Sequence, residues 1–178
     1  TELLNTYFIK NDHYRNMKNY PHNLLINNDD DWSTLAAGDK ENFCQIYPEN
    51  QIVTVNSSEE TNRKNYVQNH LLQPYELVHI RAHGNYQAHV FYQNGQTLYN
   101  SVTISDYVEN DPQVFFYSLY ICSSSDFIQS NNLANILTFN PDSPTLLSWG
   151  SSKTGGLYKE KNLYKYLGEG KNFGTAFR

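Results

Sequence analysis

The chain has 178 residues and a formal net charge of −5, with 39% hydrophobic and 17% charged residues. This length fits one domain with a sizeable core, and the low charged content is unlike that of a disordered tail. The sequence has no run of Lys or Arg and no apolar stretch long enough to cross a bilayer, so neither nucleic acid nor a membrane is an expected partner. We therefore expect a single domain over residues 1–178, complete or part of a longer chain.

Residues 1–16 predict an amphipathic helix. Leu3, Leu4, Tyr7 and Phe8 fall on one face at helical spacing, which is the pattern of a helix with an apolar stripe. We expect this helix to cover the sheet.

Three acidic residues follow the first predicted strand, Leu24–Ile26. Asp29, Asp30 and Asp31 are consecutive and precede Trp32, and like charges this close repel one another. A core would not hold them together, so we expect them at the tip of the strand, on the border of a site. A solvated loop and a Ca²⁺ site built from Asp and Asn oxygens are the two alternatives.

A second strand, Ile52–Val55, is followed by a helix. Ser57 and Glu60 have the spacing of a capping box, in which each side chain bonds the backbone N–H of the other residue. This spacing predicts a helix that begins there and runs to Leu72.

Two longer apolar runs end in chemically reactive side chains. Glu76–Ala82 is followed by His83, and Gln113–Ile121 is followed by Cys122. Such runs are typical of strands in a parallel sheet that is covered on both faces. Sites in these sheets form beyond the carboxyl ends of the strands, so neighbouring strands would bring an imidazole and a thiol together. A thiol needs a base or a positive neighbour to become a useful nucleophile.

The segment between these two strands predicts a hairpin. The arms His89–Gln93 and Gln96–Asn100 flank Asn-Gly, a strong hairpin signal, and a short helix over Val102–Val108 follows. We expect His89 at the rim of the hairpin, and we expect His79, inside its strand, to be buried and hydrogen-bonded.

The remaining segment continues the alternation of strands and helices. A helix around Leu133–Leu137 precedes the strand Thr145–Trp149, and the loop Gly150–Gly156 follows it. We expect this loop to form one wall of a substrate cleft, with Trp149 and Ser151 as substrate-binding residues. The whole alternation predicts an α/β fold, a three-layer α/β/α sandwich with a mostly parallel sheet.

The two blocks together resemble the cysteine peptidases of the caspase–gingipain clan. Members have a hydrophobic block that ends in His-Gly and a second block that ends in the nucleophilic Cys, as His83-Gly84 and Cys122 do here. The chain is most similar to the gingipain-like peptidases, in which Asp-Phe follows the Cys, as Asp126-Phe127 do here. Small residues usually precede the Cys in that family, whereas Ile121 does so here. The resemblance covers most of the chain and implies a caspase-like fold, and we expect a secreted or cell-surface protein.

The resemblance implies a role for each site residue. Cys122 would attack the scissile carbonyl, and His83 would protonate the leaving amine and then help water to release the acyl-enzyme. The backbone N–H groups of Gly84 and Cys122 would hold the oxyanion. Asp30, at the position of the family's acid, would orient the imidazole. The substrate would be a peptide or protein, and no cofactor or metal is implied.

The resemblance also suggests cleavage after Arg or Lys. In gingipain-like enzymes that prefer Arg, the acid that binds the substrate cation follows the His-pairing acid. The same interval along the chain, 41 − 30 = 11 residues, leads here from Asp30 to Glu41. Asp39 lies two residues before Glu41. An exposed charged turn is the alternative for Asp39 and Glu41, because residues 33–50 predict a loop with a short helical piece.

Three other functions stay open beside a cysteine endopeptidase. A zinc site could use Cys122, His83 and one Asp, although no Cys-x-x-Cys or His-Glu-x-x-His spacing occurs. A metal-dependent hydrolase could be built on Asp29–Asp31. A catalytically inactive relative, a binding or cell-surface module that kept the caspase-like fold, would suit the low charge and the many Tyr and Asn residues. A catalytic role requires a free thiol, so we expect no disulfide between Cys44 and Cys122.

Overall fold

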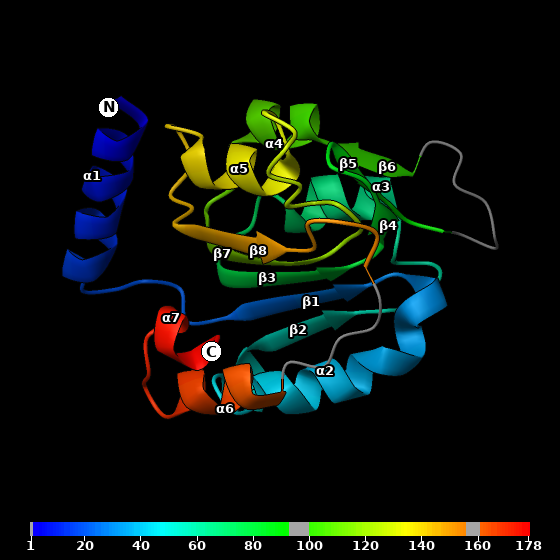
Figure 1. The fold of residues 1–178 in the computed structure, drawn as a ribbon. Coiled ribbons are helices and arrows are strands. Elements are labelled where there is room, and N and C mark those ends of the chain that lie inside the picture. Colours follow the sequence, from blue (N-terminus) through cyan, green and yellow to red (C-terminus); the bar gives the residue numbers. More distant parts are fainter. Residues whose placement is uncertain (1, 93–99, 156–160) are drawn as a thin grey trace.

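The centre of the molecule is a sheet of five parallel strands in the order β2-β1-β3-β7-β8 (Figure 1). The structure is a computed structural model that describes residues 2–92, 100–155 and 161–178, with the side chains of Asp30 and Lys161 outside the description. All neighbouring pairs in this sheet run parallel, which confirms the predicted α/β class and parallel sheet. The strands are β1 (Leu24–Asn28), β2 (Ile52–Val55), β3 (Tyr75–Arg81), β7 (Val114–Tyr120) and β8 (Leu147–Gly150).

Helices lie on both faces of this sheet (Figure 1). In the described ranges none of them is both long and apolar enough to span a membrane. The α-helices are α1 (Glu2–Asn16), α2 (Ala36–Phe43), α3 (Arg63–Asn65), α4 (Ile104–Asn110), α5 (Leu133–Phe139), α6 (Lys161–Gly168) and α7 (Phe173–Ala176). Shorter helical pieces are η1 (Asp30–Leu35), η2 (Glu49–Gln51) and the π-helical turn η3 (Tyr66–His70).

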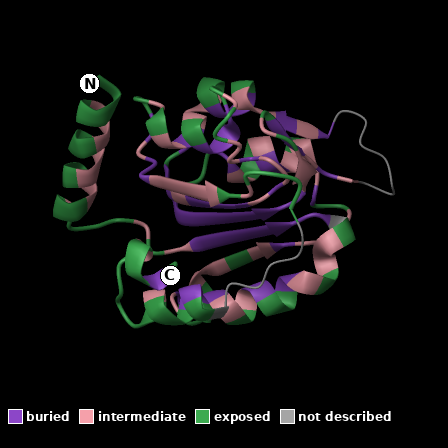
Figure 2. Ribbon diagram, in the orientation of Figure 1, coloured by how far each residue is buried: buried purple, intermediate pink, exposed green. Residues whose placement is uncertain are grey.

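The middle strands are buried because helices shield both of their faces. Every residue of β1 and β3 is buried (Figure 2). Val78 and Ile80 of β3 belong to a core cluster that includes residues of α4 and α5. Leu77, on the other face of β3, belongs to a second cluster with Phe43 of α2 and Tyr164 of α6. Alternate residues of one strand thus enter two different cores, as the two-residue period of a strand requires.

A small antiparallel sheet follows β3. It has the order β4-β5-β6, with β4 (His83–Gly84), β5 (Ala88–Val90) and β6 (Ser101–Thr103). An antiparallel pair, β5 with β6, is present, but β6 begins after the predicted second arm, Gln96–Asn100. The predicted turn Asn94-Gly95 and most of that arm lie outside the described part of the chain. The helix predicted over Val102–Val108 begins later, at Ile104, because Thr103 and Asp106 form a capping box there.

The N-terminal helix α1 does not cover a face of the sheet, contrary to the prediction. It has no buried residue, and Leu3 and Phe8 are both more than half exposed. Lys10 Nζ donates to two carbonyl oxygens at the end of α5, and the ring of Tyr14 packs against the start of β7. The helix stands beside the amino ends of the strands (Figure 1), where the other helices leave room.

The helix predicted from Ser57 begins later than expected. Ser57 Oγ does donate to Glu60 Oε2 at 2.9 Å, but residues 57–62 form turns. The cap is Asn62, whose side chain accepts from the N–H of Asn65. A capping-box spacing identifies a candidate start, and a second capping residue further along the chain can replace it.

His89 is fully buried, so the prediction that it lies at the rim of the hairpin was wrong. Its Nε2 is 3.0 Å from the hydroxyl of Tyr107, which lies 3.1 Å from the hydroxyl of Tyr66. Burial lowers the pKa of the His89 imidazole to about 3, although the charge of Asp106 acts in the opposite direction. The imidazole is thus neutral in the folded protein at neutral pH.

We expect His89 to make the stability of the protein depend on pH. An unfolded imidazole has a pKa of about 6.5, so between that value and about 3 the unfolded chain binds a proton that the folded chain does not. The contribution of His89 to the free energy of unfolding is therefore complete above about pH 6.5. Below that pH the free energy of unfolding falls by about 1.4 kcal/mol per pH unit because of this group. His89→Gln should make the slope shallower in urea unfolding at pH 7, 5.5 and 4. The exposed His13→Gln is the matched control, and an unchanged slope in His89→Gln would contradict the assignment.

Candidate active site

The parallel register brings the carboxyl ends of four strands to one edge of the sheet. Arg81 of β3 is level with Asn28 of β1 and with Tyr120 of β7, and Leu119 is level with Gly150 of β8. The segments that follow these strands therefore meet at the same edge, where sites form in open α/β sheets.

A cavity of about 460 Å³ lies at this edge. His83 and Cys122 both line it, together with Trp149 and Ser151, the two residues expected in one wall of a cleft. Its volume is within the range of small-molecule and peptide side-chain pockets. Other lining residues, which the sequence did not single out, include Trp32, Arg81, Tyr120 and Phe177.

The His83 imidazole contacts two aromatic rings and one carboxylate. Its ring centroid is 4.5 Å from that of Tyr92 and 5.5 Å from that of Trp32. Its Nε2 is 3.2 Å from Oδ2 of Asp31, and 38% of the side chain is exposed. These neighbours limit the rotation of the ring while it stays accessible from the cavity.

The acid beside His83 is Asp31, whereas the resemblance assigned this role to Asp30. The side chain of Asp30 lies outside the description, so that assignment stays a prediction. Asp29 is fully buried, and both of its carboxylate oxygens accept from the Tyr92 N–H at 3.0 Å. One of the three acids is thus in the core, contrary to expectation, because a backbone donor compensates for the water that its carboxylate loses.

The turn that carries Cys122 is bonded to the loop after β8. The N–H of Ser123 donates to the carbonyl of Lys153, and the N–H of Ser125 donates to the carbonyl of Ser151, each at 2.9 Å. Ser123 has a left-handed backbone with φ of 56°, a conformation that surrounding structure must enforce in a non-glycine residue. These bonds hold the turn against the loop that contributes Ser151 to the cavity.

Gly84 packs directly against the residue that precedes Cys122. A Cβ on Gly84 would lie 2.6 Å from Cγ2 of Ile121 and 2.3 Å from the carbonyl oxygen of Ala88, so no larger residue fits. Ile121 is itself buried in the core. The missing side chain of Gly84 makes room for Ile121, at a position where the peptidases that the chain resembles have a small residue.

The backbone N–H groups of Gly84 and Cys122 have no hydrogen-bond partner among the described residues. Asn85 N–H donates to the carbonyl of Ala88 at 2.9 Å, which makes these two residues a hydrogen-bonded pair of the β4–β5 ladder. Bonded and non-bonded pairs alternate in an antiparallel ladder, so Gly84 is in a non-bonded pair and its N–H points away from β5.

Cys122 and His83 are not hydrogen-bonded to each other in this structure. Both cysteines are free thiols, with Cys44 exposed and Cys122 partly buried. Catalytic hydrogen bonds are often long in a protein without substrate and shorten only when the substrate binds. The two residues thus share one cavity without a direct hydrogen bond.

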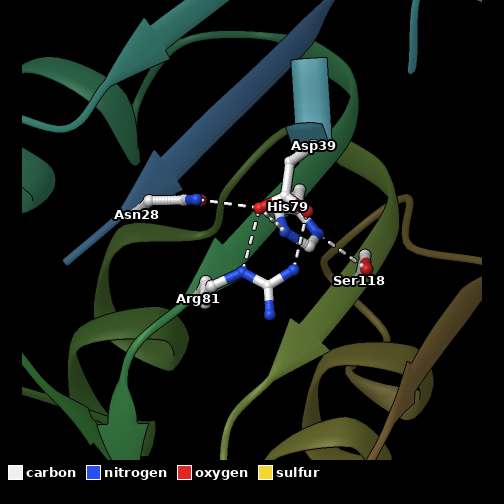
Figure 3. Close-up of polar contacts among 5 residues, drawn as sticks. All are labelled: Asn28, Asp39, His79, Arg81 and Ser118. Atoms are coloured by element: carbon white, nitrogen blue, oxygen red, sulfur yellow. Dashed lines mark hydrogen bonds and ion pairs between the residues drawn. The ribbon is translucent and has the colours of Figure 1, made fainter. Parts of the chain in front are cut away.

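Asp39 belongs to a buried cluster of polar side chains (Figure 3). It is not among the residues that line the cavity. Its carboxylate accepts from Arg81 Nε at 2.9 Å and Nη2 at 2.6 Å, and from the amide of Asn28 at 2.8 Å. Burial raises the pKa of Asp39, but bonds and charges from His79 and Arg81 outweigh burial and hold the pKa well below its ordinary range. Burial lowers the pKa of His79, so near neutral pH Arg81 is the cation that balances this carboxylate.

A Ser-His-Asp arrangement occurs in the same cluster but is closed to substrate. His79 Nδ1 is 2.9 Å from Ser118 Oγ, and His79 Nε2 is 3.5 Å from Asp39 Oδ2 (Figure 3). His79 and Ser118 have no exposed surface, and neither lines the cavity. The prediction that His79 is buried and hydrogen-bonded is confirmed, and the arrangement stabilises the interior where α2 meets β3.

Two expected substrate-binding residues are thus away from the cavity walls. Asp39 is already paired, and Glu41 is exposed on α2 and does not line the cavity. The residue that sequence reasoning missed is Arg81. A signal was present, because a charged side chain in a buried strand is rare unless it is paired, and Arg81 precedes His83 by two residues in the sequence.

No family model matches this chain, and no curated protein matches it either. Within the described residues no group of three or more His, Cys, Asp or Glu side chains is arranged to hold a metal ion. The function therefore has to be inferred from the geometry of the site and from the resemblance of the two apolar blocks, before His83-Gly84 and Cys122, to those of known peptidases.

We expect the Arg81–Asp39 pair to be far more costly to break than to replace as a unit. Arg81→Gln alone leaves a buried carboxylate without its cation, which should lower the free energy of unfolding by about 3–5 kcal/mol. Arg81→Gln combined with Asp39→Asn leaves two neutral partners and should recover most of that loss. Urea unfolding at pH 7 measures both, and equal losses in the two variants would show that the pair acts through packing alone.

The Arg81–Asp39 pair should also make the stability of the protein depend on pH. Because the folded pKa of Asp39 is below its unfolded value, its contribution is complete above pH of about 4 and is lost as the pH falls below it. The double variant should therefore lose less stability than the wild type between pH 4 and pH 2.5.

Proposed function

We propose that the protein is a cysteine endopeptidase whose nucleophile is Cys122 and whose general acid–base is His83. The observation that carries the proposal is the cavity at the sheet edge, because the imidazole that follows one apolar block and the thiol that follows the other both line it. The segments that directly follow the parallel neighbours β3 and β7 carry these two residues, which supports the resemblance to the caspase–gingipain clan and a caspase-like fold.

The chemistry is acyl transfer from a peptide bond. The Cys122 sulfur would form a bond to the scissile carbonyl carbon, while His83 takes up the thiol proton and delivers it to the leaving amine. Water, with its proton taken by His83, would then release the new carboxylic acid and restore the thiol. The N–H groups of Gly84 and Cys122, free of partners in the described chain, would stabilise the negative oxygen of each tetrahedral intermediate.

Asp31 is the residue we assign to orient the imidazole. It is the acid within 3.2 Å of His83 Nε2, which leaves Nδ1 for proton exchange with the thiol and substrate. The carboxylate is 47% exposed, so water weakens its effect and we expect a supporting role. Asp30 follows the same strand, and its contribution is tested beside that of Asp31.

We expect Cys122→Ala to abolish hydrolysis of peptides, with a loss of at least about 10³-fold in kcat, as for removal of a nucleophile. Cys44→Ala should leave the rate unchanged because Cys44 is exposed and does not line the cavity. Hydrolysis of a fluorogenic peptide library and labelling with iodoacetamide, followed by mass spectrometry, would measure both. Equal rates in the two variants, or an unreactive Cys122, would favour an inactive binding module instead.

We expect Asp31→Asn to lower kcat/KM by up to about fivefold, since a half-exposed ion pair contributes about 1 kcal/mol or less. Asp30→Asn is the matched control, because it removes the neighbouring acid with the same change of shape. A larger effect of Asp30→Asn than of Asp31→Asn would return the orienting role to Asp30.

A further inference from the structure

One buried residue connects the segments that surround the His83 imidazole. Asp29 is fully buried, and its N–H donates to the carbonyl of Arg81 at 2.8 Å. Its own carbonyl accepts from the N–H of Trp32 at 2.8 Å, and its carboxylate accepts from the N–H of Tyr92 at 3.0 Å. These bonds hold the end of β3, the helical piece η1 and the chain after β5 in one arrangement.

The two rings that contact His83 belong to residues bonded to Asp29. The ring of Trp32 is tilted by 40° against the imidazole, and the closer ring of Tyr92 is tilted by 60°. Trp32 also lines the cavity, where a substrate would touch it, whereas Tyr92 is not among the lining residues. An effect of the Tyr92 ring on the reaction would therefore act through the imidazole.

The antiparallel ladder explains how Tyr92 reaches the imidazole. His83 of β4 is directly opposite Val90 of β5, and Phe91 N–H donates to the carbonyl of Asn100, so the chain stays paired as far as Tyr92. Alternate residues of an extended chain point to the same face, which makes Tyr92 a diagonal neighbour of His83. Diagonal neighbours are within reach of an aromatic side chain, and the ring centroids are 4.5 Å apart.

We propose that Tyr92 is a positioning residue for His83 and that the buried Asp29 carboxylate holds Tyr92 in place. The inference rests on the proposed function, because the imidazole has to exchange a proton with Cys122. The ring packs on the imidazole while Asp31 lies 3.2 Å from Nε2, so the two contacts together fix the ring with Nδ1 left for the thiol. Such positioning matters because a displacement of about 1 Å can reduce the rate about 100-fold.

The first test separates the ring of Tyr92 from its hydroxyl. Tyr92→Ala should lower kcat by about tenfold to 100-fold with little change in KM, because the ring does not touch the substrate. Tyr92→Phe keeps the ring contact and should restore a rate close to that of the wild type. Hydrolysis of a fluorogenic peptide measures both. An unchanged kcat in Tyr92→Ala, equal losses in the two variants, or an effect on KM alone would overturn the inference.

The matched control for this test is Tyr20→Ala. The ring of Tyr20 also packs against a histidine, His22, with the centroids 6.3 Å apart, and neither residue lines the cavity. We expect this variant to keep the wild-type kcat and KM. A loss of kcat as large as that of Tyr92→Ala would show that the effect is a general loss of packing and would contradict a specific role of Tyr92.

Proton NMR of the His83 imidazole measures its position without hydrolysis. An aromatic ring shifts the signals of protons that lie against it, so in Cys122→Ala the added change Tyr92→Ala should move the His83 ring signals and Tyr92→Phe should keep them. Asp29→Ala should move the same signals because the N–H of Tyr92 loses its acceptor. Asp29→Asn, which keeps an acceptor oxygen, should restore them, and unfolding in urea verifies that each variant is folded. His83 signals that stay in place in Tyr92→Ala would refute the contact.

The two measurements distinguish failure of this inference from failure of the proposed function. Signals that move as expected, with no hydrolysis of any peptide by the wild type, would refute the peptidase and retain Tyr92 as the residue that orients His83. Hydrolysis that Tyr92→Ala leaves unchanged would refute the positioning role and retain the peptidase.

Discussion

Parallel pairing of β3 with β1 on one side and β7 on the other determines where the reactive groups of this protein lie. The register sets Arg81 level with Asn28 and Tyr120, so His83 and Cys122 emerge from the same edge. A slip of one residue in either pairing would turn a whole strand over and send its polar side chains into the opposite core. The apolar side chains on the other face of β3 oppose such a slip, because each is buried in a tightly packed cluster.

From β3 into β4, the exposure of alternate side chains increases along the chain toward the cavity. His79 is fully buried, Arg81 is 6% exposed, and His83 has 38% of its side chain exposed. The buried Arg81–Asp39 pair lies between the two imidazoles and joins α2 to the strand. A buried ion pair is weak evidence for stability, because desolvation offsets most of the attraction. Here the Arg81–Asp39 pair acts by positioning, since it fixes the depth and the direction of the Arg81 guanidinium at the cavity wall.

The sequence was sufficient for the fold class because the strands carry their own pattern. Long apolar runs such as Gln113–Ile121 are unambiguous, and parallel strands place their ends together whatever the loops do. The surroundings of the histidines outside the main sheet were harder to predict. His89 was expected at the surface, yet its hydrogen bond to Tyr107 makes burial of a neutral imidazole acceptable. Which acid lies beside His83 depends on the path of η1, and no spacing rule determines that path.

The role of Asp39 shows the limit of reasoning from spacing. An interval along the chain can place a carboxylate near a site, but its partner is chosen in three dimensions. Arg81 lies on another element, 42 residues away along the chain, so no short interval from Asp39 leads to it. Because the two are paired, the member of this pair that lines the cavity is the cation Arg81.

The turn at Cys122 explains how a thiol with no hydrogen bond to His83 can still be held in place. Glycines flank it on both sides: Gly84 from β4 packs against Ile121, and a Cβ on Gly150 of β8 would lie 2.3 Å from Ser124 Oγ. A side chain at either glycine would clash with the turn, so the backbone of the turn is enclosed between neighbouring segments. The left-handed Ser123 is then enforced by its surroundings. Backbone packing can thus hold Cys122 in place without a hydrogen bond from His83.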